Sequence, residues 1–464
     1  MDTRRIPHPP RRVPVLGDIL GVSPRTPVQD SVRIARELGS PLFVRKIFGK
    51  EIVFACGAGP AADLSDEKRF AKHVGLGIEA LRALGGDGLF TAYTHEPNWQ
   101  AAHDILAPAF TQSAMRTYHP VMRDMAHRLL GHWDAADRPV DVAADMTKLT
   151  LETIARTGFG YDFGSFERTE PHPFVTAMTG ALRHAQQQTV RLPGLGNLLA
   201  RGADRRNAER LAHLTEVIDD VIRARRDAGE ERTDDLLGLM LHTGHPETGR
   251  PLDEVNIRNQ VITFLVAGHE TTSGALSFAL YYLARHPEVL ARARAEADAV
   301  WGPPGELPPD PSFEQIPKLR YVRRVLDEAL RLWPTAPAYG RQAREDTVLD
   351  GTYPMRRGHW ALVLLPALHR DPDIWGPDPE AFDPDRFAPA AVRARPAHTY
   401  KPFGTGARAC IGRQFALHEA VLVLALLVHR YDMAADPAYD LKVTELLTMK
   451  PEGFALEVRR RKAP

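Results

Sequence analysis

Residues 401–412 read KPFGTGARACIG, and they run into the apolar stretch FALHEAVLVL at 415–424. The glycines predict a loop in the first stretch, and the apolar spacing predicts a helix in the second, so Cys410 should lie at a helix N-terminus. The helix dipole and the N–H groups of the first turn favour thiolate over thiol there. Such a sulfur can ligate a metal, and the flanking glycines let a flat cofactor approach the backbone. The alternative is a small buried hydrophobic residue, as most free cysteines are.

Length, composition and charge limit the class of protein. The chain has 464 residues, of which 44% are hydrophobic, enough for a large core. Lys and Arg number 59, as do Asp and Glu, so the net charge is zero and no nucleic-acid partner is indicated. Two cysteines leave no disulfide framework, which is typical of a reducing compartment. The N-terminus has no apolar run long enough for a signal peptide or anchor, so we expect a cytoplasmic protein without a membrane partner.

The residue pattern predicts a mainly α chain with small β-sheets, an α+β fold. Residues 1–30 are rich in Pro and Arg and are expected to be extended, and residues 40–58 are typical of a small antiparallel sheet. Helical periodicity dominates from about 98 to 300 and includes one long helix at 201–227, with a loop before it at 191–197. Strand-like alternation returns at 440–460. The candidate site residues described below are spread from residue 72 to residue 447 and would have to meet at one cofactor. We therefore expect a single domain over 1–464.

A second motif lies in an apolar helix expected from about 256 to 283, whose middle reads AGHETTSG at 267–274. A charge such as Glu270 in an apolar helix is costly unless it has a partner or a function. Glycine, threonine and serine there also weaken the helical hydrogen-bond ladder. The alternative is a solvated polar stripe, which the surrounding bulky apolar residues argue against.

Two further pairs have helical spacing. Glu328 and Arg331 are three residues apart, which places both charges on one helix face. Trp99 and His103 are four residues apart. Taken alone, both pairs are commonplace, and a surface ion pair and a hydrogen-bonded surface histidine are the ordinary alternatives.

Together these motifs resemble the cytochrome P450 family. The haem-binding loop of that family reads Phe, Gly, two residues, Arg, one residue, Cys, one residue, Gly, and each fixed position is met, by Phe403, Gly404, Arg408, Cys410 and Gly412. The resemblance implies the P450 fold around a buried haem b, with the cysteine as the axial thiolate. It implies a haem-dependent monooxygenase that inserts one atom of O2 into an apolar substrate by hydroxylation or epoxidation.

The resemblance also implies roles for the other motifs. Glu270 and Thr271 become an acid–alcohol pair that helps to deliver protons to bound oxygen. Glu328, Arg331 and Arg386 become a buried ion network that fixes the loop of the cysteine. The residues that the resemblance implies as haem contacts are Lys72, Trp99, His103, Phe403, Gly404, Arg408 and Gly412.

Within the family the chain most resembles the haem domain of bacterial self-sufficient fatty-acid hydroxylases, which are fused to a flavin reductase. In that subgroup an arginine and a tyrosine bind the fatty-acid carboxylate, and Lys50 and Phe54 stand at those positions here. A fatty acid and a biosynthetic intermediate of similar bulk are therefore both open as substrates. The substrate pocket that the resemblance implies, with Phe90 over the haem, consists of Leu76, Ile78, Leu81, Phe90, Met178, Leu182, Ala267, Ala336, Ala338 and Leu447.

The chain contains no nucleotide-binding motif, and it ends at Pro464 without a reductase domain. Either it is an excised haem domain, or it is a stand-alone oxygenase that borrows its electrons. We therefore expect its electrons to come from a separate ferredoxin or flavodoxin with its reductase, which docks near Lys401 and Arg413. Two alternative functions stay open: a peroxide-driven relative, which usually lacks the acid–alcohol pair, and a non-catalytic haem-binding sensor. A spin shift of the haem on substrate binding would discriminate an enzyme from a sensor.

Overall fold

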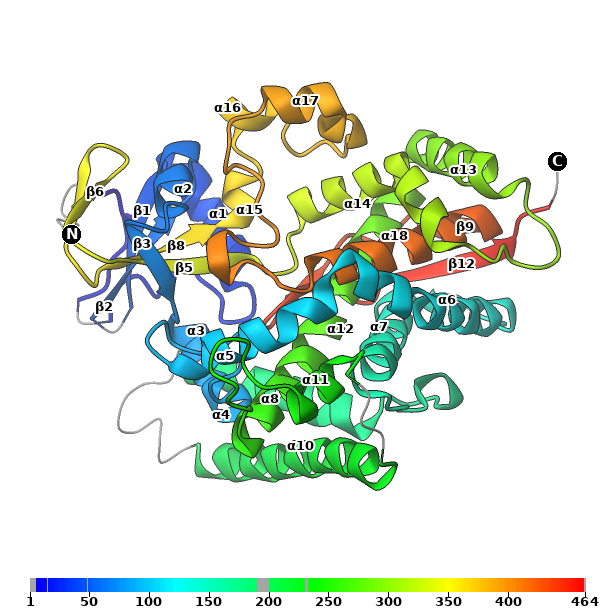
Figure 1. The fold of residues 1–464 in the computed structure, drawn as a ribbon. Helices are drawn as coiled ribbons and strands as arrows, with labels where there is room; N and C mark the ends of the chain where they lie inside the picture. Colours follow the sequence, from blue (N-terminus) through cyan, green and yellow to red (C-terminus); the bar gives the residue numbers. More distant parts are fainter. Residues whose placement is uncertain (1–5, 15, 48, 190–199, 230–232, 463–464) are drawn as a thin grey trace. The chain divides into compact units, whose positions relative to one another are not determined.

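The computed structural model describes residues 6–14, 16–47, 49–189, 200–229 and 233–462. The chain divides into two compact units, one of residues 1–75 and 327–410 and the other of residues 76–326 and 411–464. Each unit combines two separate stretches of sequence. Helices are the main elements and the sheets are small (Figure 1), so the predicted fold class is confirmed.

The first unit contains a five-stranded sheet of order β1-β2-β8-β5-β3. Strands β1 (Leu42–Ile47) and β2 (Lys50–Ala55) form an antiparallel hairpin in which Phe43 pairs with Phe54. The antiparallel pair predicted at 40–58 therefore exists, but it belongs to a larger mixed sheet, since β2 runs parallel to β8. The remaining strands are β8 (Trp360–Leu364), β5 (Ala338–Ala343) and β3 (Phe70–His73).

The prediction of an extended segment over residues 1–30 was wrong at its end, because helix α1 begins at Pro27 and runs to Leu38. A proline at the first helical position has no N–H to lose and a φ that suits a helix. Val32, Ile34 and Ala35 of α1 pack in one apolar cluster with Phe43 and Phe54 of the hairpin. The other elements of this unit are α2 (Ala58–Leu64), β6 (Thr347–Leu349), β7 (Tyr353–Met355), α15 (Leu365–Leu368), α16 (Pro372–Trp375), η5 (Pro384–Phe387), α17 (Pro389–Ala394) and η6 (Gly406–Arg408).

The second unit is built around α12 (Glu254–Arg285), which packs against α7 (Val142–Phe159) and α18 (Arg413–Arg430). The helix predicted at 256–283 starts two residues earlier because the side chain of Asp253 caps it, accepting from the N–H of Asn256. The helix predicted at 201–227 is confirmed as α10 (Arg201–Asp227), whereas the loop predicted at 191–197 lies outside the described residues. Helix α14 (Arg320–Leu332) begins in this unit and ends in the first.

Further helices and short strands complete the second unit. The strand-like alternation predicted at 440–460 is confirmed as β10, β11 and β12. The elements are α3 (Leu76–Ala80), α4 (Arg82–Gly85), α5 (Pro97–Leu106), η2 (Ala107–Phe110), α6 (Gln112–Asp134), β4 (Val140–Asp141), η3 (Ser165–Glu167), α8 (Pro173–Thr189), α11 (Leu236–His242), α13 (Pro287–Trp301), η4 (Phe313–Lys318), β9 (Tyr431–Ala435), β10 (Val443–Glu445), β11 (Met449–Pro451) and β12 (Ala455–Arg460).

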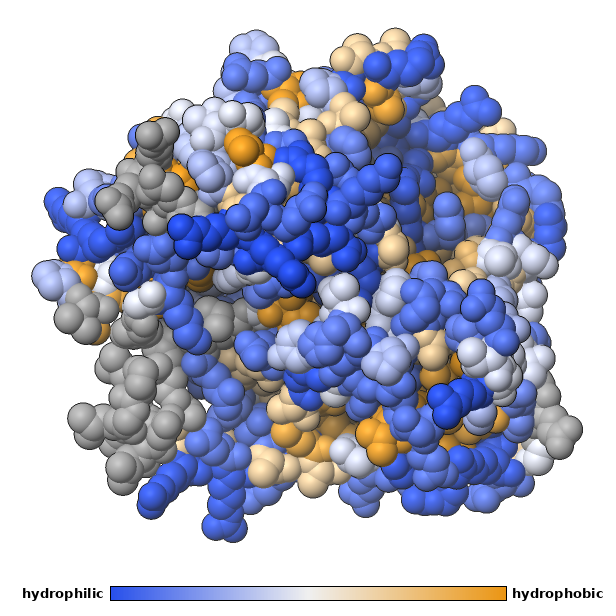
Figure 2. Space-filling model, turned by 60° about the vertical axis from the view of Figure 1, so that its left-hand side comes forward, coloured by the Kyte–Doolittle hydropathy of each residue, from blue (hydrophilic) through white to orange (hydrophobic). Residues whose placement is uncertain are grey.

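Among the described residues, no helix combines the length and the apolar character that a membrane crossing requires. The face in Figure 2 is mainly hydrophilic, and its hydrophobic residues form scattered patches.

Candidate functional site

The loop that carries Cys410 has the geometry that the sequence predicts. Gly404 and Gly406 have φ values of 74° and 68°, a region that L side chains rarely adopt. The N–H of Cys410 donates to the carbonyl of Phe403 at 2.8 Å, which closes the loop. Cys410 itself is exposed, and it lies two residues before Gly412, the N-cap of α18. The sulfur is therefore held by backbone geometry and is accessible to a ligand.

The other cysteine, Cys56, is unsuited to ligation. It is buried in the apolar cluster that α1 forms with the hairpin. Burial, with a smaller effect from the charge of Asp371, raises the pKa of the Cys56 thiol far above its ordinary value. Of the two cysteines, Cys410 alone is exposed and so could ligate a metal.

Glu328 and Arg331 on α14 form a fully buried ion pair with two hydrogen bonds of 2.7 Å. The remaining donors of Arg331 reach the carbonyls of His369, Pro379 and Ala381 at 2.7–3.0 Å. Arg386 approaches the same glutamate, with its Nε 3.6 Å from Oε1 of Glu328. The structure thus brings together the three side chains of the predicted network, in the bidentate geometry that makes such pairs strong.

A residue that the sequence analysis missed, His369, links this network to the loop. Its carbonyl accepts from Arg331, and its Nε2 accepts from the N–H of Lys401 at 3.1 Å. Burial, followed by the charge of Arg331, lowers the pKa of His369 to about 3, so the ring is neutral and Nε2 is an acceptor. Lys401 is the first residue of the loop. The side chain of Arg331 and the start of the loop of Cys410 are therefore connected through one residue, His369, by its backbone carbonyl on one side and its imidazole on the other.

Lys72 of β3 and Arg408 of the loop bring two positive charges together. Burial, followed by the charge of Arg408, lowers the pKa of Lys72 well below its ordinary value. An anionic group beside these two cations would offset both effects. Close by, Oε1 of Glu67 accepts from the N–H of Ala407 at 2.8 Å, and a Cβ added to Gly406 would lie 2.0 Å from that carboxyl group. These glycine and cationic positions fit a flat anionic cofactor such as haem.

Glu270 lies in the middle of α12, where it is 7% exposed. Thr448 donates to its Oε2 at 2.9 Å, and Lys450 of β11 lies 3.2 Å from its Oε1. His269 lies 3.3 Å from the same oxygen. Burial alone would raise the pKa of Glu270, but Lys450, His269 and Thr448 outweigh it and hold the pKa well below its ordinary value. This carboxylate is therefore ionised, and no local sequence pattern pointed to Thr448 or Lys450 as its partners.

Thr271, the other half of the predicted acid–alcohol pair, donates its hydroxyl to the carbonyl of Ala267 at 2.9 Å. Ala267 is exposed although it lies within a largely buried helix. The expected weakening of the helix does not interrupt it, because α12 stays helical from 254 to 285. Hydroxyl groups, including those of Ser273 and Ser277, donate to carbonyls within the helix.

Trp99 and His103 lie together on α5, with ring centroids 5.1 Å apart. The Nδ1 of His103 lies 3.2 Å from Oδ1 of Asp104.

The predicted pocket residues fall into three groups. Leu81, Met178 and Leu182 are buried, Ile78, Ala338 and Leu447 are half-buried, and Phe90 and Ala336 are exposed, while the side chain of Leu76 lies outside the described residues.

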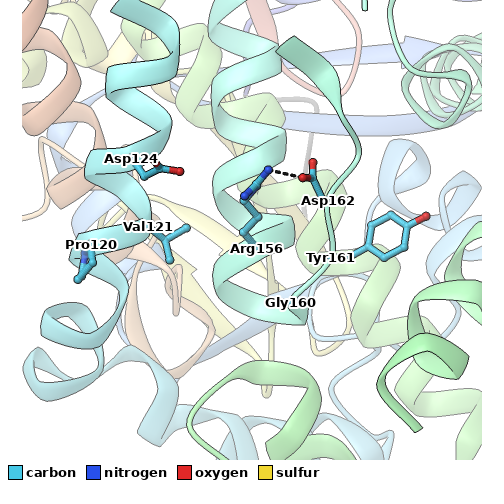
Figure 3. Close-up of a pocket in the computed structure, with 7 residues that line it drawn as sticks. All are labelled: Pro120, Val121, Asp124, Arg156, Gly160, Tyr161 and Asp162. Atoms are coloured by element: carbon cyan, nitrogen blue, oxygen red, sulfur yellow. Dashed lines mark hydrogen bonds and ion pairs between the residues drawn. The ribbon is translucent and has the colours of Figure 1, made fainter. Parts of the chain in front are cut away.

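A separate surface cavity of about 330 Å³ lies between α6 and α7 (Figure 3). Arg156 pairs with Asp162 within it. None of the predicted site residues lines this cavity, so it has no part in the predicted chemistry. Its lining consists of Pro120, Val121, Asp124, Arg156, Gly160, Tyr161 and Asp162.

Comparison with known proteins agrees with this geometry. Residues 7–458 match the family model of cytochrome P450. The bifunctional cytochrome P450/NADPH–P450 reductase 2 of Bacillus subtilis is 48% identical over 93% of this chain, and its counterpart in Bacillus cereus is 44% identical over 98%. A self-sufficient cytochrome P450 monooxygenase of Penicillium camemberti is 40% identical over 98%. The chain spans 40–43% of the length of these relatives.

The chain therefore belongs to the cytochrome P450 family. It is a member of a family of haem enzymes, and its cofactor is haem b. The relatives are named as fusions of a P450 with an NADPH–P450 reductase, which does not support the expected separate ferredoxin or flavodoxin.

Proposed function

We propose that this chain hydroxylates or epoxidises an apolar substrate, and that the thiolate of Cys410 would ligate the haem iron. The observation that carries the proposal is an exposed cysteine on a backbone loop built by Gly404 and Gly406 and followed by the N-terminus of α18. Bound haem supplies the iron at which O2 is bound and cleaved. Lys72 and Arg408 would hold its anionic groups, and the cysteine sulfur would hold its metal.

We propose that Glu270 and Thr271 handle protons. Glu270 is ionised, with the Thr448 hydroxyl bound to its Oε2 and the Lys450 ammonium beside its Oε1. If Lys450 moves away, Oε1 becomes available to accept a proton. The Thr271 hydroxyl donates to a carbonyl of its own helix in this structure and can turn to donate elsewhere at the cost of one hydrogen bond. The pairing of a buried acid, Glu270, with an adjacent alcohol, Thr271, favours an O2-dependent monooxygenase over the peroxide-driven alternative.

We propose a substrate that is bound mainly by apolar contacts, either fatty acid-like or a biosynthetic intermediate of similar bulk. Phe54 supports this proposal, because its ring stacks on Phe43 at 4.6 Å and belongs to the core of the first unit. A ring committed to the core, and lacking a hydroxyl group, cannot bind a carboxylate. Lys50 is exposed and offers a single point charge rather than the fork of an arginine.

For the electron supply, we propose an NADPH-dependent P450 reductase, either joined to this chain or separate from it. The proposal rests on the relatives, whose names give both activities. Exposed Arg413, at the start of α18, and Lys401 remain our candidates for the surface that receives it. We also propose a cytoplasmic location, since the reducing compartment keeps an accessible thiol such as Cys410 available for ligation.

The test is spectroscopic. The reduced protein with carbon monoxide should show the red-shifted Soret band of thiolate ligation, Cys410→Ser should lose it, and Cys56→Ser should keep it. An unchanged band in Cys410→Ser would refute the ligand assignment. A panel of fatty acids, their esters and neutral lipids should then include compounds that shift the haem spin state and are turned over. Spin shifts without turnover, even with a reductase supplied, would favour the sensor.

A further inference from the structure

The segment that carries Phe90 lies against the first turns of α12. Gly86 has a φ of 48°, and a Cβ added there would lie 2.3 Å from Nδ2 of Asn259. A Cβ added to Gly88 would lie 2.3 Å from Oγ1 of Thr263 and 2.7 Å from the carbonyl of Asn259. Only glycine leaves enough room for this approach. The backbone on both sides of residue 87 is therefore in direct contact with the helix.

Four amide side chains hold this segment, and we call them the amide platform: Asn98 on α5, and Asn256, Asn259 and Gln260 on α12. Asp87 accepts at Oδ1 from Asn256 and Asn259, at 2.9 and 2.8 Å. It accepts at Oδ2 from Asn98 at 2.6 Å. The platform therefore saturates one carboxylate from two helices.

The platform also holds the backbone next to Phe90. Oε1 of Gln260 accepts from the N–H of Leu89 at 3.0 Å, and its Nε2 donates to Oδ1 of Asn256 at 3.1 Å. Asn256 and Gln260 are 1% and 0% exposed. Buried polar groups that are fully paired specify one geometry, because every alternative leaves some of them without partners. Phe90, the next residue, is 37% exposed.

The donors of the platform are neutral, and this distinguishes it from a surface ion pair. Burial alone would raise the pKa of Asp87, but the bonds from Asn259, Asn98 and Asn256 hold it below its ordinary value. Salt does not screen amide donors as it screens surface charges, and amides do not titrate. The platform therefore depends less on pH and salt than a surface ion pair does, because its donors carry no charge and the pKa of its acceptor, Asp87, is lowered.

The position of the platform on α12 relates Phe90 to the proton-handling pair. Asn259 precedes Glu270 by eleven residues, which is three helical turns or about 16 Å along the axis. One regular helix therefore carries both the platform and the acid–alcohol pair. A displacement of the segment on the platform would move Phe90 relative to Glu270 and Thr271 without changing the helix.

We propose that the amide platform is a positioning device that fixes Phe90 and thereby sets which ligands fit over the haem. The proposal rests on the proposed function, in which Phe90 faces the substrate. A purely structural role would affect stability alone, whereas a positioning role predicts changes in the order of the Phe90 ring and in discrimination between ligands of different bulk.

The experiment uses the haem-loaded protein with 4-fluorophenylalanine at position 90. In the diamagnetic ferrous carbon monoxide form, the fluorine spectrum should show one narrow resonance for the wild type. Asn259→Ala and Asp87→Asn should broaden or split it. Gln100→Ala is the matched control: it lies on α5 like Asn98, but its side chain bonds to Asp104, and it should match the wild type.

The second measurement compares the Kd values of 4-phenylimidazole and imidazole by optical titration of the ferric protein. Breaking the platform should change the ratio of the two Kd values by about fivefold or more. In the Asp87→Ala background, Asn259→Ala should cause little further change, because its acceptor is already absent. Unaltered fluorine spectra, or altered spectra with an unchanged Kd ratio, would overturn the proposal. A protein that lacks the thiolate carbon monoxide band would instead contradict the proposed function.

Discussion

Glu419 gives a quantitative test of how the helix behind the cysteine loop is stabilised. It lies on α18, nine residues after Cys410, and is 1% exposed. Among the described residues, neither of its carboxyl oxygens has a hydrogen-bond partner. Burial raises the pKa of Glu419 to about 8, and the nearby Thr153 on α7 offsets only part of this effect. We therefore predict that Glu419 is protonated at neutral pH.

The sign and size of the pH effect follow from linkage. Below the ordinary pKa of 4.5, the carboxyl group is protonated in both the folded and the unfolded chain. Between pH 4.5 and about 8 the unfolded chain ionises at this residue while the folded chain does not. The free energy of unfolding then falls by about 1.4 kcal/mol per pH unit, on the order of 5 kcal/mol over the whole interval. Above that interval both states are ionised and the loss is constant.

Glu419→Gln removes the titration and keeps the shape. The amide has its own cost of burial, but that cost does not depend on pH. The unfolding free energy of the variant minus that of the wild type should therefore increase by about 4 kcal/mol between pH 5 and pH 8. The assay is urea unfolding of the haem-loaded protein, followed by far-ultraviolet circular dichroism at each pH. Glu209→Gln, an exposed position on α10, is the control and should show almost no slope.

A difference that stays constant from pH 5 to pH 8 would refute the reasoning. It would mean that the folded protein accommodates the charged carboxylate of Glu419, for example through buried water. A difference that decreases with pH would reverse the sign of the argument and show that the charged form is stabilised by the fold.

Three further outcomes follow from the site. Lys450→Met should lower the unfolding free energy by about 3 kcal/mol at pH 7, because it leaves the buried carboxylate of Glu270 without its cation. The difference in unfolding free energy between wild type and variant should shrink as the pH falls below 4.5 towards the lowered pKa of Glu270, which acid unfolding would show. A difference independent of pH would contradict this. Arg331→Lys removes the two parallel hydrogen bonds to Glu328, so the unfolding free energy should fall by about 3–5 kcal/mol. The haem content per protein should fall as well. Full haem content would count against the role of the Glu328–Arg331–Arg386 network in holding the cysteine loop. A fatty acid should bind less than about tenfold better than its methyl ester, since a full carboxylate clamp is worth about 1.5–3 kcal/mol, and a larger preference that Lys50→Ala abolishes would show that Lys50 is an anchor.

The fold class could be predicted from the sequence because it depends on local periodicity. The long helix at 201–227 has the bounds that its pattern predicts, and α12 differs by two residues at each end. Helix α1 could not be predicted, since the composition of residues 1–30 resembles an extended segment and its proline stands where a helix tolerates it. The strands of the first unit come from two distant stretches of sequence, 42–73 and 338–364, so their pairing depends on contacts that no local pattern contains.

The residues of the candidate site likewise divide into those that local sequence could predict and those that it could not. The position of Cys410 just before a helix and the contact between Glu328 and Arg331 were predictable, because both depend on local sequence. His369 was not, because its role depends on two hydrogen bonds to residues 331 and 401, far from it in the sequence. Neither a sequence motif nor a helical spacing marks such a residue. Its neutral ring becomes understandable only once burial and the charge of Arg331 are known.

The two polar centres of α12 show why one helix can control both proton handling and substrate fit. Near its N-terminus, neutral amides bind the segment at 87–89, and in its middle Glu270 binds Thr448 and Lys450 from the other end of the chain. The amides of the first centre do not titrate, and their bonds keep the pKa of Asp87 below its ordinary value, so this centre keeps its hydrogen bonds at neutral pH. The second contains charges whose pairing can change when a proton arrives. If Glu270 handles protons and Phe90 faces the substrate, as we propose, separating a fixed centre from a titrating one on the same helix lets protons move at Glu270 without loosening Phe90.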